Sequence, residues 1–293
     1  TLTPTRTPIP IAAASYYAEG LAHQREGQAE EALRSLTWAI QLDPDFAPFY
    51  VTRGAVHLSQ GNLPAALTDA KAALERDSTN AAAHALHGET LRLLGRPRRA
   101  LEAFDRAVAL DPSLTSETFR SRWLAALATR DDTRLAPLGR EYTALHPTDP
   151  LRLYYRGWGL TSLGLPRIAI DMLVRGIQTT PDPPALLWFT LGHAYAADGA
   201  WKEAVTSFEA TRMLVQAGDT SLGLHSDQPI VELFDALGRA YLGAGRCADA
   251  RAMIEYVLLI GGSPAIYDPI LERVYICYTP TPTVTPYLTA TPG

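Results

Sequence analysis

The chain has 293 residues, with 47% apolar residues, 19% charged residues and a formal net charge of −5. This composition fits a folded protein with a sizeable core. The acidic balance argues against a nucleic-acid binder or a protein that binds anionic membranes, since either would present a basic surface. No apolar run approaches the ~18–20 residues of a membrane-spanning helix, so we expect no membrane insertion.

Both ends of the chain are rich in threonine and proline. Residues 1–10 read TLTPTRTPIP, and residues 279–293 read TPTPTVTPYLTATPG. Proline at this density favours extended polyproline II. Three interpretations stay open: a passive linker, an O-glycosylated stalk, and an arm that binds a neighbouring subunit. The candidate glycan acceptors are Thr1, Thr3, Thr5, Thr7, Thr279, Thr281, Thr283, Thr285, Thr289 and Thr291.

Between the tails, a unit of about 34 residues recurs. Gly20, Gly54 and Gly88 are spaced by one unit, and the series continues at Gly157, Gly192 and Gly238. Each glycine is followed after seven residues by a second glycine and after twelve by an alanine. The first glycine and the alanine allow two antiparallel helices to approach closely, and the second glycine suits a left-handed turn between them. The spacing from Gly192 to Gly238 contains a 12-residue insertion.

The motif in these units resembles the tetratricopeptide repeat. Residues Trp188, Leu191, Gly192, Tyr195, Ala204 and Phe208 match the pattern W-x2-L-G-x2-Y followed by A-x3-F. The resemblance implies an all-α, right-handed solenoid of about seven helix-turn-helix repeats, at 13–46, 47–80, 81–114, 115–149, 150–183, 185–218 and 231–264. Repeat four has Arg122 in place of the glycine, so we expect its helices to pack more loosely.

The remaining segments complete the predicted domain organisation. Residues 1–12 form an N-terminal tail, residues 13–264 form the solenoid, and residues 279–293 form a C-terminal tail. Residues 265–278 are predicted to form a helix that begins near Pro269 and caps the exposed apolar end of the solenoid.

The resemblance also implies a concave groove lined by the first helix of each repeat. The family register places there Tyr17, Leu21, Gln24, Val51, Leu58, Glu89, Arg92, Tyr154, Trp158, Thr161, Phe189, His193, Asp235 and Arg239. The set is rich in aromatic residues and weakly charged. It therefore favours a proline-rich segment or a glycan over a peptide carboxylate, although some of these residues are equally expected to pack between repeats.

Cys247 and Cys277 are the two cysteines of the chain. Cys247 begins the second helix of the last repeat, and Cys277 ends the capping helix that should pack antiparallel to it. In an oxidising compartment they can form a disulfide contributing about 3–4 kcal/mol to stability. Two buried free thiols are the alternative.

Sequence patterns for catalysis or metal binding are weak. His84 and His87 share a helix face, and His23 and His57 share a repeat position, but both pairs are better explained as packed or solvated side chains. Gly243-x-Gly245-x-x-Ala248 follows a helix instead of the strand that a dinucleotide-binding loop requires. We expect no enzyme activity, no metal and no cofactor, apart from covalent O-linked glycans.

Two functions therefore stay open. The first is a structural subunit of an extracellular, O-glycosylated fibre in which the tail of one copy docks on the next, giving a head-to-tail polymer. The second is an exported adaptor that binds a partner protein or proline-rich peptide in its groove while tethered to the cell envelope. Both place the chain outside the cell or at its surface, with an export signal already removed.

Overall fold

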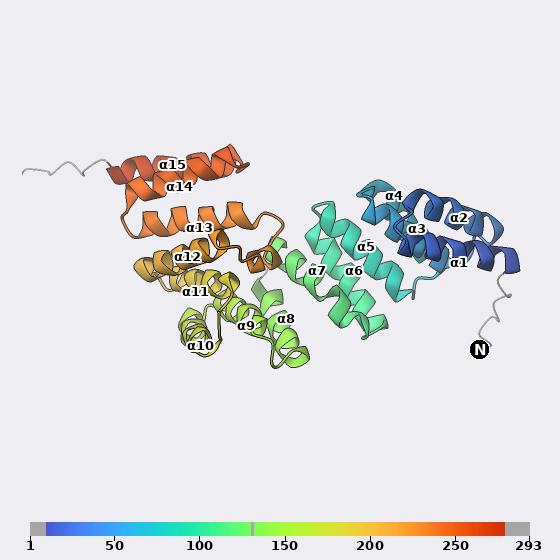
Figure 1. The fold of residues 1–293 in the computed structure, drawn as a ribbon, viewed down its shortest axis with the longest axis horizontal. Coiled ribbons are helices and arrows are strands. Elements are labelled where there is room, and N and C mark those ends of the chain that lie inside the picture. Colours follow the sequence, from blue (N-terminus) through green and yellow to red (C-terminus); the bar gives the residue numbers. More distant parts are fainter. Residues whose placement is uncertain (1–9, 130–131, 279–293) are drawn as a thin grey trace, which may run out of the picture. The chain divides into compact units, whose positions relative to one another are not determined.

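The computed structural model describes residues 10–129 and 132–278, and Figure 1 shows their course. These residues form fifteen α-helices and one short 3-10 helix, and the described segments contain no strand. The prediction of an all-α protein built from helical hairpins, as in an α-solenoid, is confirmed. Among the helices that the structure describes, none is both long enough and apolar enough to cross a membrane.

The helices follow one another as pairs joined by short turns. In chain order they are α1 (Ile11–Arg25), α2 (Ala29–Leu42), α3 (Ala47–Ser59), α4 (Leu63–Arg76), α5 (Ala81–Leu93), α6 (Pro97–Leu110), α7 (Leu114–Thr129), α8 (Asp132–Leu145), α9 (Leu151–Ser162), α10 (Pro166–Thr179), α11 (Ala185–Ala197), α12 (Trp201–Gln216), η1 (Ser221–Leu224), α13 (Pro229–Gly243), α14 (Cys247–Leu259) and α15 (Pro264–Tyr278).

The recurring glycine of the first helix is required by close packing within each pair. A Cβ atom at Gly192 would lie 2.6 Å from the ring of Phe208, and one at Gly20 would lie 2.7 Å from Leu36. Both partners are sixteen residues further along the chain, so the second helix presses a large side chain onto bare backbone. Since no real Cβ tolerates such distances, the repeat depends on glycine here.

The second glycine ends the turn between paired helices. Gly27 and Gly199 have φ angles of 75° and 79°, in the left-handed region where a side chain would be strained. The equivalent glycines of the other repeats behave alike, which explains why the sequence keeps glycine at this spacing.

The described residues divide into two compact units. Of the described residues, unit 1 comprises 10–129 and 132–134, and unit 2 comprises 135–278. The division falls within repeat four, the repeat in which Arg122 replaces the packing glycine, and Arg122 is buried with 8% of its surface exposed.

The final helix starts earlier than predicted. Helix α15 begins at Pro264, directly after Ser263, whose carbonyl oxygen accepts a hydrogen bond from the Ile266 amide at 2.9 Å. Pro264 suits the first helical position because its missing N–H would be unpaired there. The predicted bounds of 265–278 agree with this helix to within one residue, but Pro269 lies inside the helix instead of near its start.

Candidate interaction surfaces

The first helices of the repeats carry the residues predicted to line a groove. Four of them, Tyr17, Val51, Tyr154 and Phe189, occupy the same register position, three residues before the packing glycine. We call the helix face that they mark the groove face. The packing of this face differs between the two units.

In unit 1 the groove face is partly exposed. Tyr17 and Val51 are half-buried and pack against a core cluster that includes Phe49. The Tyr17 ring lies 5.0 Å from that of Phe49, and its hydroxyl is 3.1 Å from the Thr52 hydroxyl. These contacts fix the Tyr17 ring while leaving part of its surface accessible.

The remaining predicted residues of unit 1 are also partly accessible. Leu21, Leu58 and Arg92 are half-buried, and Gln24 is exposed. Arg92 donates two hydrogen bonds to Glu89, at 2.9 and 2.8 Å, so its charge is already neutralised locally. This pair lowers the capacity of the face to attract a free carboxylate, consistent with a weakly charged surface.

In unit 2 the same face is closed by aromatic packing. Tyr154 and Phe189 are both fully buried, with 0% of their surface exposed. The Trp158 ring lies 6.2 Å from that of Phe189 and 4.7 Å from that of His193, and Phe189 also packs 5.7 Å from Phe208. Such ring pairs add to the stability gained by burial alone.

The closure comes from the inserted segment between α12 and α13. His225, just after η1, is buried and places its ring 4.5 Å from that of Trp158 and 4.9 Å from that of Phe189. Its Nδ1 atom is hydrogen-bonded to the Tyr154 hydroxyl at 3.0 Å, and its Nε2 atom lies 3.0 Å from a Glu232 carboxylate oxygen. The expectation that Tyr154 and Phe189 line an open groove is therefore corrected, because the insert covers them.

Two polar residues fasten the insert to the start of α11. The Ala185 amide donates to Asp219 at 2.9 Å, and the Leu186 amide donates to the Ser221 hydroxyl at 3.1 Å. These amides belong to the first turn of α11, where backbone donors have no partner within the helix. Burial alone would raise the pKa of Asp219, but its hydrogen bonds with Ser221 and Ala185 lower it overall.

The closed cluster also changes the titration of His193. Burial, followed by the nearby His225, lowers the pKa of His193 from 6.5 to about 3. The ring is therefore neutral at physiological pH, and it serves as a packing group with a small exposed edge. His193 is half-buried, so it takes part in the aromatic cluster while part of its ring stays accessible, and its assignment to the groove stays a prediction.

Two further groove predictions fall on α13. Arg239 is exposed and donates from Nε to Asp235 at 2.8 Å, one helical turn away. Thr161 on α9 donates its hydroxyl to the Gly157 carbonyl at 2.9 Å, which occupies its side chain within its own helix.

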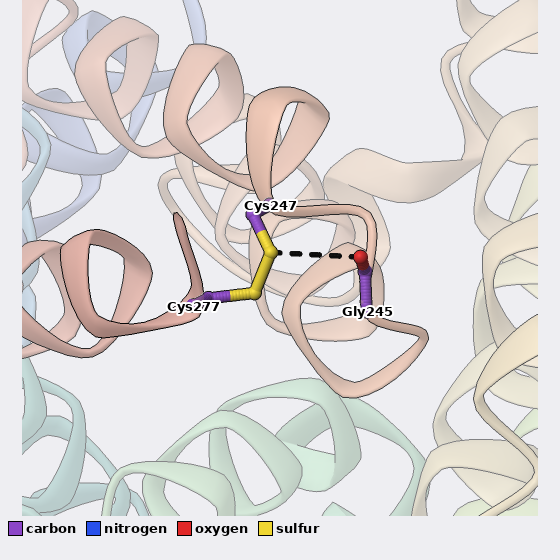
Figure 2. Close-up of a disulfide and its surroundings, with 3 residues drawn as sticks. All are labelled: Gly245, Cys247 and Cys277. Atoms are coloured by element: carbon purple, nitrogen blue, oxygen red, sulfur yellow. Dashed lines mark hydrogen bonds between the residues drawn. A yellow bond between two sulfur atoms is a disulfide. The ribbon is translucent and has the colours of Figure 1, made fainter. Parts of the chain in front are cut away.

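The cysteines meet where α14 begins and α15 ends (Figure 2). The structure joins Cys247 and Cys277 in a disulfide with a Cα–Cα distance of 5.9 Å, in the usual range for such a bond. Cys247 Sγ also lies 3.5 Å from the Gly245 carbonyl oxygen. The bond ties the last helix to the last repeat.

The ten threonines predicted to carry glycans, in 1–7 and 279–291, lie outside the described residues. Within the described ranges, no group of three or more histidine, cysteine, aspartate or glutamate side chains is placed to hold a metal ion.

Comparison with known proteins relates part of the chain to a family. A family model described as tetratricopeptide repeat matches residues 17–81 and 51–115. A curated relative, protein NPGR2 of Arabidopsis thaliana, is 29% identical over 125 residues, which are 41% of this chain and 17% of the relative. The chain thus spans a small part of that relative.

Solved structures show the same fold. A tetratricopeptide repeat protein from Parabacteroides merdae superimposes with a TM-score of 0.67 at 14% identity, covering 91% of this chain and all of that one. PilF of Pseudomonas aeruginosa gives a TM-score of 0.52 at 19% identity, covering 73% of this chain and 95% of that one. Together with the repeat motif, these matches show that the chain has the helical-hairpin fold of tetratricopeptide repeat proteins.

Proposed function

We propose that the chain is a non-enzymatic structural subunit whose copies join end to end in an extracellular fibre. Tetratricopeptide repeats generally act as scaffolds for protein–protein contacts. The observation that carries the finer proposal is a pair of exposed apolar patches, one on the first helical hairpin and one on the last.

The C-terminal patch flanks the turn between α14 and α15. Leu259 is 82% exposed and Ile266 is 56% exposed. The opposite side of α15 is well packed, because Tyr267, Ile270 and Val274 are buried. The last helix therefore covers the end of the repeats but presents new apolar surface near its own start. Large apolar side chains exposed to this degree are typical of a contact site.

The N-terminal patch lies on α1 and α2. Ile11, at the start of α1, is 91% exposed, and Trp38 and Leu42, near the end of α2, are 54% and 44% exposed. The two helix ends are neighbours, since the Tyr16 ring stacks on Trp38 at 6.3 Å. A second copy that places its C-terminal patch here makes a heterologous contact, which repeats without closing.

The chain termini favour the same arrangement. The threonine-proline segment 1–9 ends two residues before Ile11, and segment 279–293 follows α15 directly. The N-terminal tail therefore ends beside a patch, and the C-terminal tail begins at the end of α15 opposite to Ile266. Each can act as a docking arm, with its threonines available for O-glycans. The Cys247–Cys277 disulfide is in keeping with an oxidising, extracellular location.

Sedimentation and electron microscopy of the purified chain test the proposal. Leu259→Asp with Ile266→Asp should convert fibres to monomers, because two charges would be buried at each contact. The matched control is Ile168→Asp with Met213→Asp, at residues that are 55% and 65% exposed on α10 and α12. Fibres that survive the first pair of substitutions, or a wild-type chain that never polymerises, would refute end-to-end assembly.

Two treatments resolve the finer parts of the proposal. Removal of residues 279–293 should abolish or shorten the fibres if the tail is a docking arm, and mass spectrometry of the terminal peptides should find glycosylated threonine. Reduction of the disulfide should release α15 and weaken assembly, with non-reducing peptide mapping to verify the bond. Unmodified threonines would remove the glycan part alone.

The groove face of unit 1 favours a second candidate function. It leaves Tyr17, Leu21, Val51 and Leu58 partly accessible, which suits an adaptor that binds a proline-rich peptide of a partner protein while tethered to the cell envelope. A threonine-proline peptide with the sequence of residues 279–293 is the direct probe. Binding that is lost in Tyr17→Ala while the chain stays monomeric would favour the adaptor over the fibre.

A further inference from the structure

A basic surface lies on α4, α5, α6 and α7 of unit 1, away from the residues of the groove face. It contains two cavities, of about 440 and 620 Å³. The first is lined by residues of α4, α5 and α6, and the second by the start of α6 and the end of α7. Arg96 and Arg99 line both, so the cavities form one continuous site.

Five cationic side chains surround this site. They are exposed, and none forms an ion pair with any residue in the described part of the chain: Lys71, Arg96, Arg98, Arg99 and Arg106. Glu102 is the one acidic residue among those lining the two cavities.

This local excess of positive charge contrasts with the net charge of the protein, which is −5. Several surface arginines elsewhere are paired, as in Arg34–Glu31, Arg175–Asp171 and Arg251–Glu255. Like charges that line the same cavity repel one another, because salt screens such interactions only beyond ~10 Å.

The positive charges around the site contribute to the lowered pKa of a neighbouring histidine. The pKa of His87, which lines the first cavity, is lowered first by burial and then by the charges of Lys71 and His84. The cavity thus disfavours any further positive charge and would attract an anion.

The lining indicates which class of anion fits. Arginine forks match carboxylates in two-point contacts. Leu67, Leu74 and Leu91 supply apolar surface beside the charges. No Phe, Tyr or Trp is among the residues that line these cavities in the described part of the chain, so nothing is available to stack on nucleic-acid bases. We propose that this surface docks an acidic peptide segment of a partner protein, with its carboxylates on the arginines and its apolar side chains on the leucines.

This proposal goes beyond end-to-end assembly, because the basic surface shares no residue with either apolar patch. A fibre subunit with such a site would recruit a second protein along its length. Failure of one proposal leaves the other standing, since the first is read by sedimentation and the second by peptide binding.

Fluorescence anisotropy with the full chain tests the proposal. The probe is a labelled peptide of about twelve residues that alternates glutamate with leucine, long enough to span both cavities. We expect binding that weakens as salt increases, and a loss of about tenfold or more in Arg96→Gln, Arg99→Gln, Arg106→Gln combined, because exposed charge contacts add up. Circular dichroism should show the helices intact, since these side chains are exposed.

The matched control removes the same charge from other helices. Arg34→Gln, Arg175→Gln and Arg251→Gln combined should bind the peptide as the wild type does, and a glutamine-leucine peptide should bind neither protein. The proposal is overturned if the two triple variants lose equal affinity, if the wild type does not bind, or if an oligothymidine binds more tightly than the acidic peptide. The Lys71→Gln variant gives a second reading and should show a smaller loss.

Discussion

The groove face is partly exposed in unit 1 and is covered by an inserted segment in unit 2. In unit 1, Tyr17 and Val51 remain half-buried on this face. In unit 2, Tyr154 and Phe189 occupy the same register position and are fully buried beneath His225. The repeat itself does not explain the difference, because its packing and turn glycines behave alike in both units. A short insert between two helices is enough to convert a surface into a core.

The difference also shows how a polar residue is accommodated in that core. His225 is 5% exposed, yet both ring nitrogens have partners, the Tyr154 hydroxyl and the Glu232 carboxylate. A buried imidazole without partners would cost free energy. Its two contacts join α9, the insert and α13, so the insert ties together helices that adjacent repeats would not connect directly.

The largest expected effect comes from deleting the ring at the shared register position in unit 2. Phe189→Ala should lower the free energy of unfolding by about 3–5 kcal/mol, because a fully buried aromatic leaves a cavity. Val51→Ala in unit 1 should cost about 1 kcal/mol, since the side chain is small and half-buried. Urea denaturation followed by circular dichroism measures both. Equal losses would mean that the two faces are packed alike.

The sequence predicts the repeat frame well because that frame depends on local backbone requirements. Gly192 is needed by the approach of Phe208, and Gly199 by its positive φ angle, and both needs appear as regular spacing. The burial of the groove face cannot be predicted in the same way. Whether Phe189 is exposed depends on where His225 docks, some 36 residues later, and no periodicity in the insert indicates that contact.

Two other features escape sequence reasoning for similar reasons. Helix α15 starts at Pro264 and continues through Pro269, so the proline that suggested a helix start lies inside the helix. The basic surface is built from Lys71 and from arginines on α6, and their convergence is a property of the packed hairpins. The 12-residue insertion was visible in the repeat spacing, and it is the signal that could have identified the covered face.

The second prediction concerns His225, the residue that covers the groove face of unit 2. His225→Ala should lower the free energy of unfolding by about 2–3 kcal/mol, because it removes a hydrogen bond to the buried Tyr154 hydroxyl and opens a small cavity. Hydrogen exchange should accelerate at the amides of Ala185, Leu186 and Ser221, which bond to or within the insert. His84→Ala, at a half-buried histidine of unit 1, is the matched control and should leave those amides protected. If they stay protected in His225→Ala as well, the insert is held by its other contacts.

The smallest expected effect is a pH dependence located in unit 2. The pKa of His193 is about 3 in the folded protein and about 6.5 when unfolded, so the unfolded state binds a proton first as pH falls. The His193 contribution is therefore unchanged above pH 6.5 and destabilising below it. By pH 5 the linkage lowers the free energy of unfolding by about 2 kcal/mol.

His193→Gln isolates that contribution, since glutamine does not titrate. The pKa values of His57 and His87 in unit 1 are also lowered by burial, and these residues affect wild type and variant equally. The difference in unfolding free energy between the two proteins should therefore shift by about 2 kcal/mol between pH 7.5 and pH 5, in favour of the variant at low pH. A constant difference would show that the His193 ring stays hydrated, and that the face of unit 2 is as open as that of unit 1.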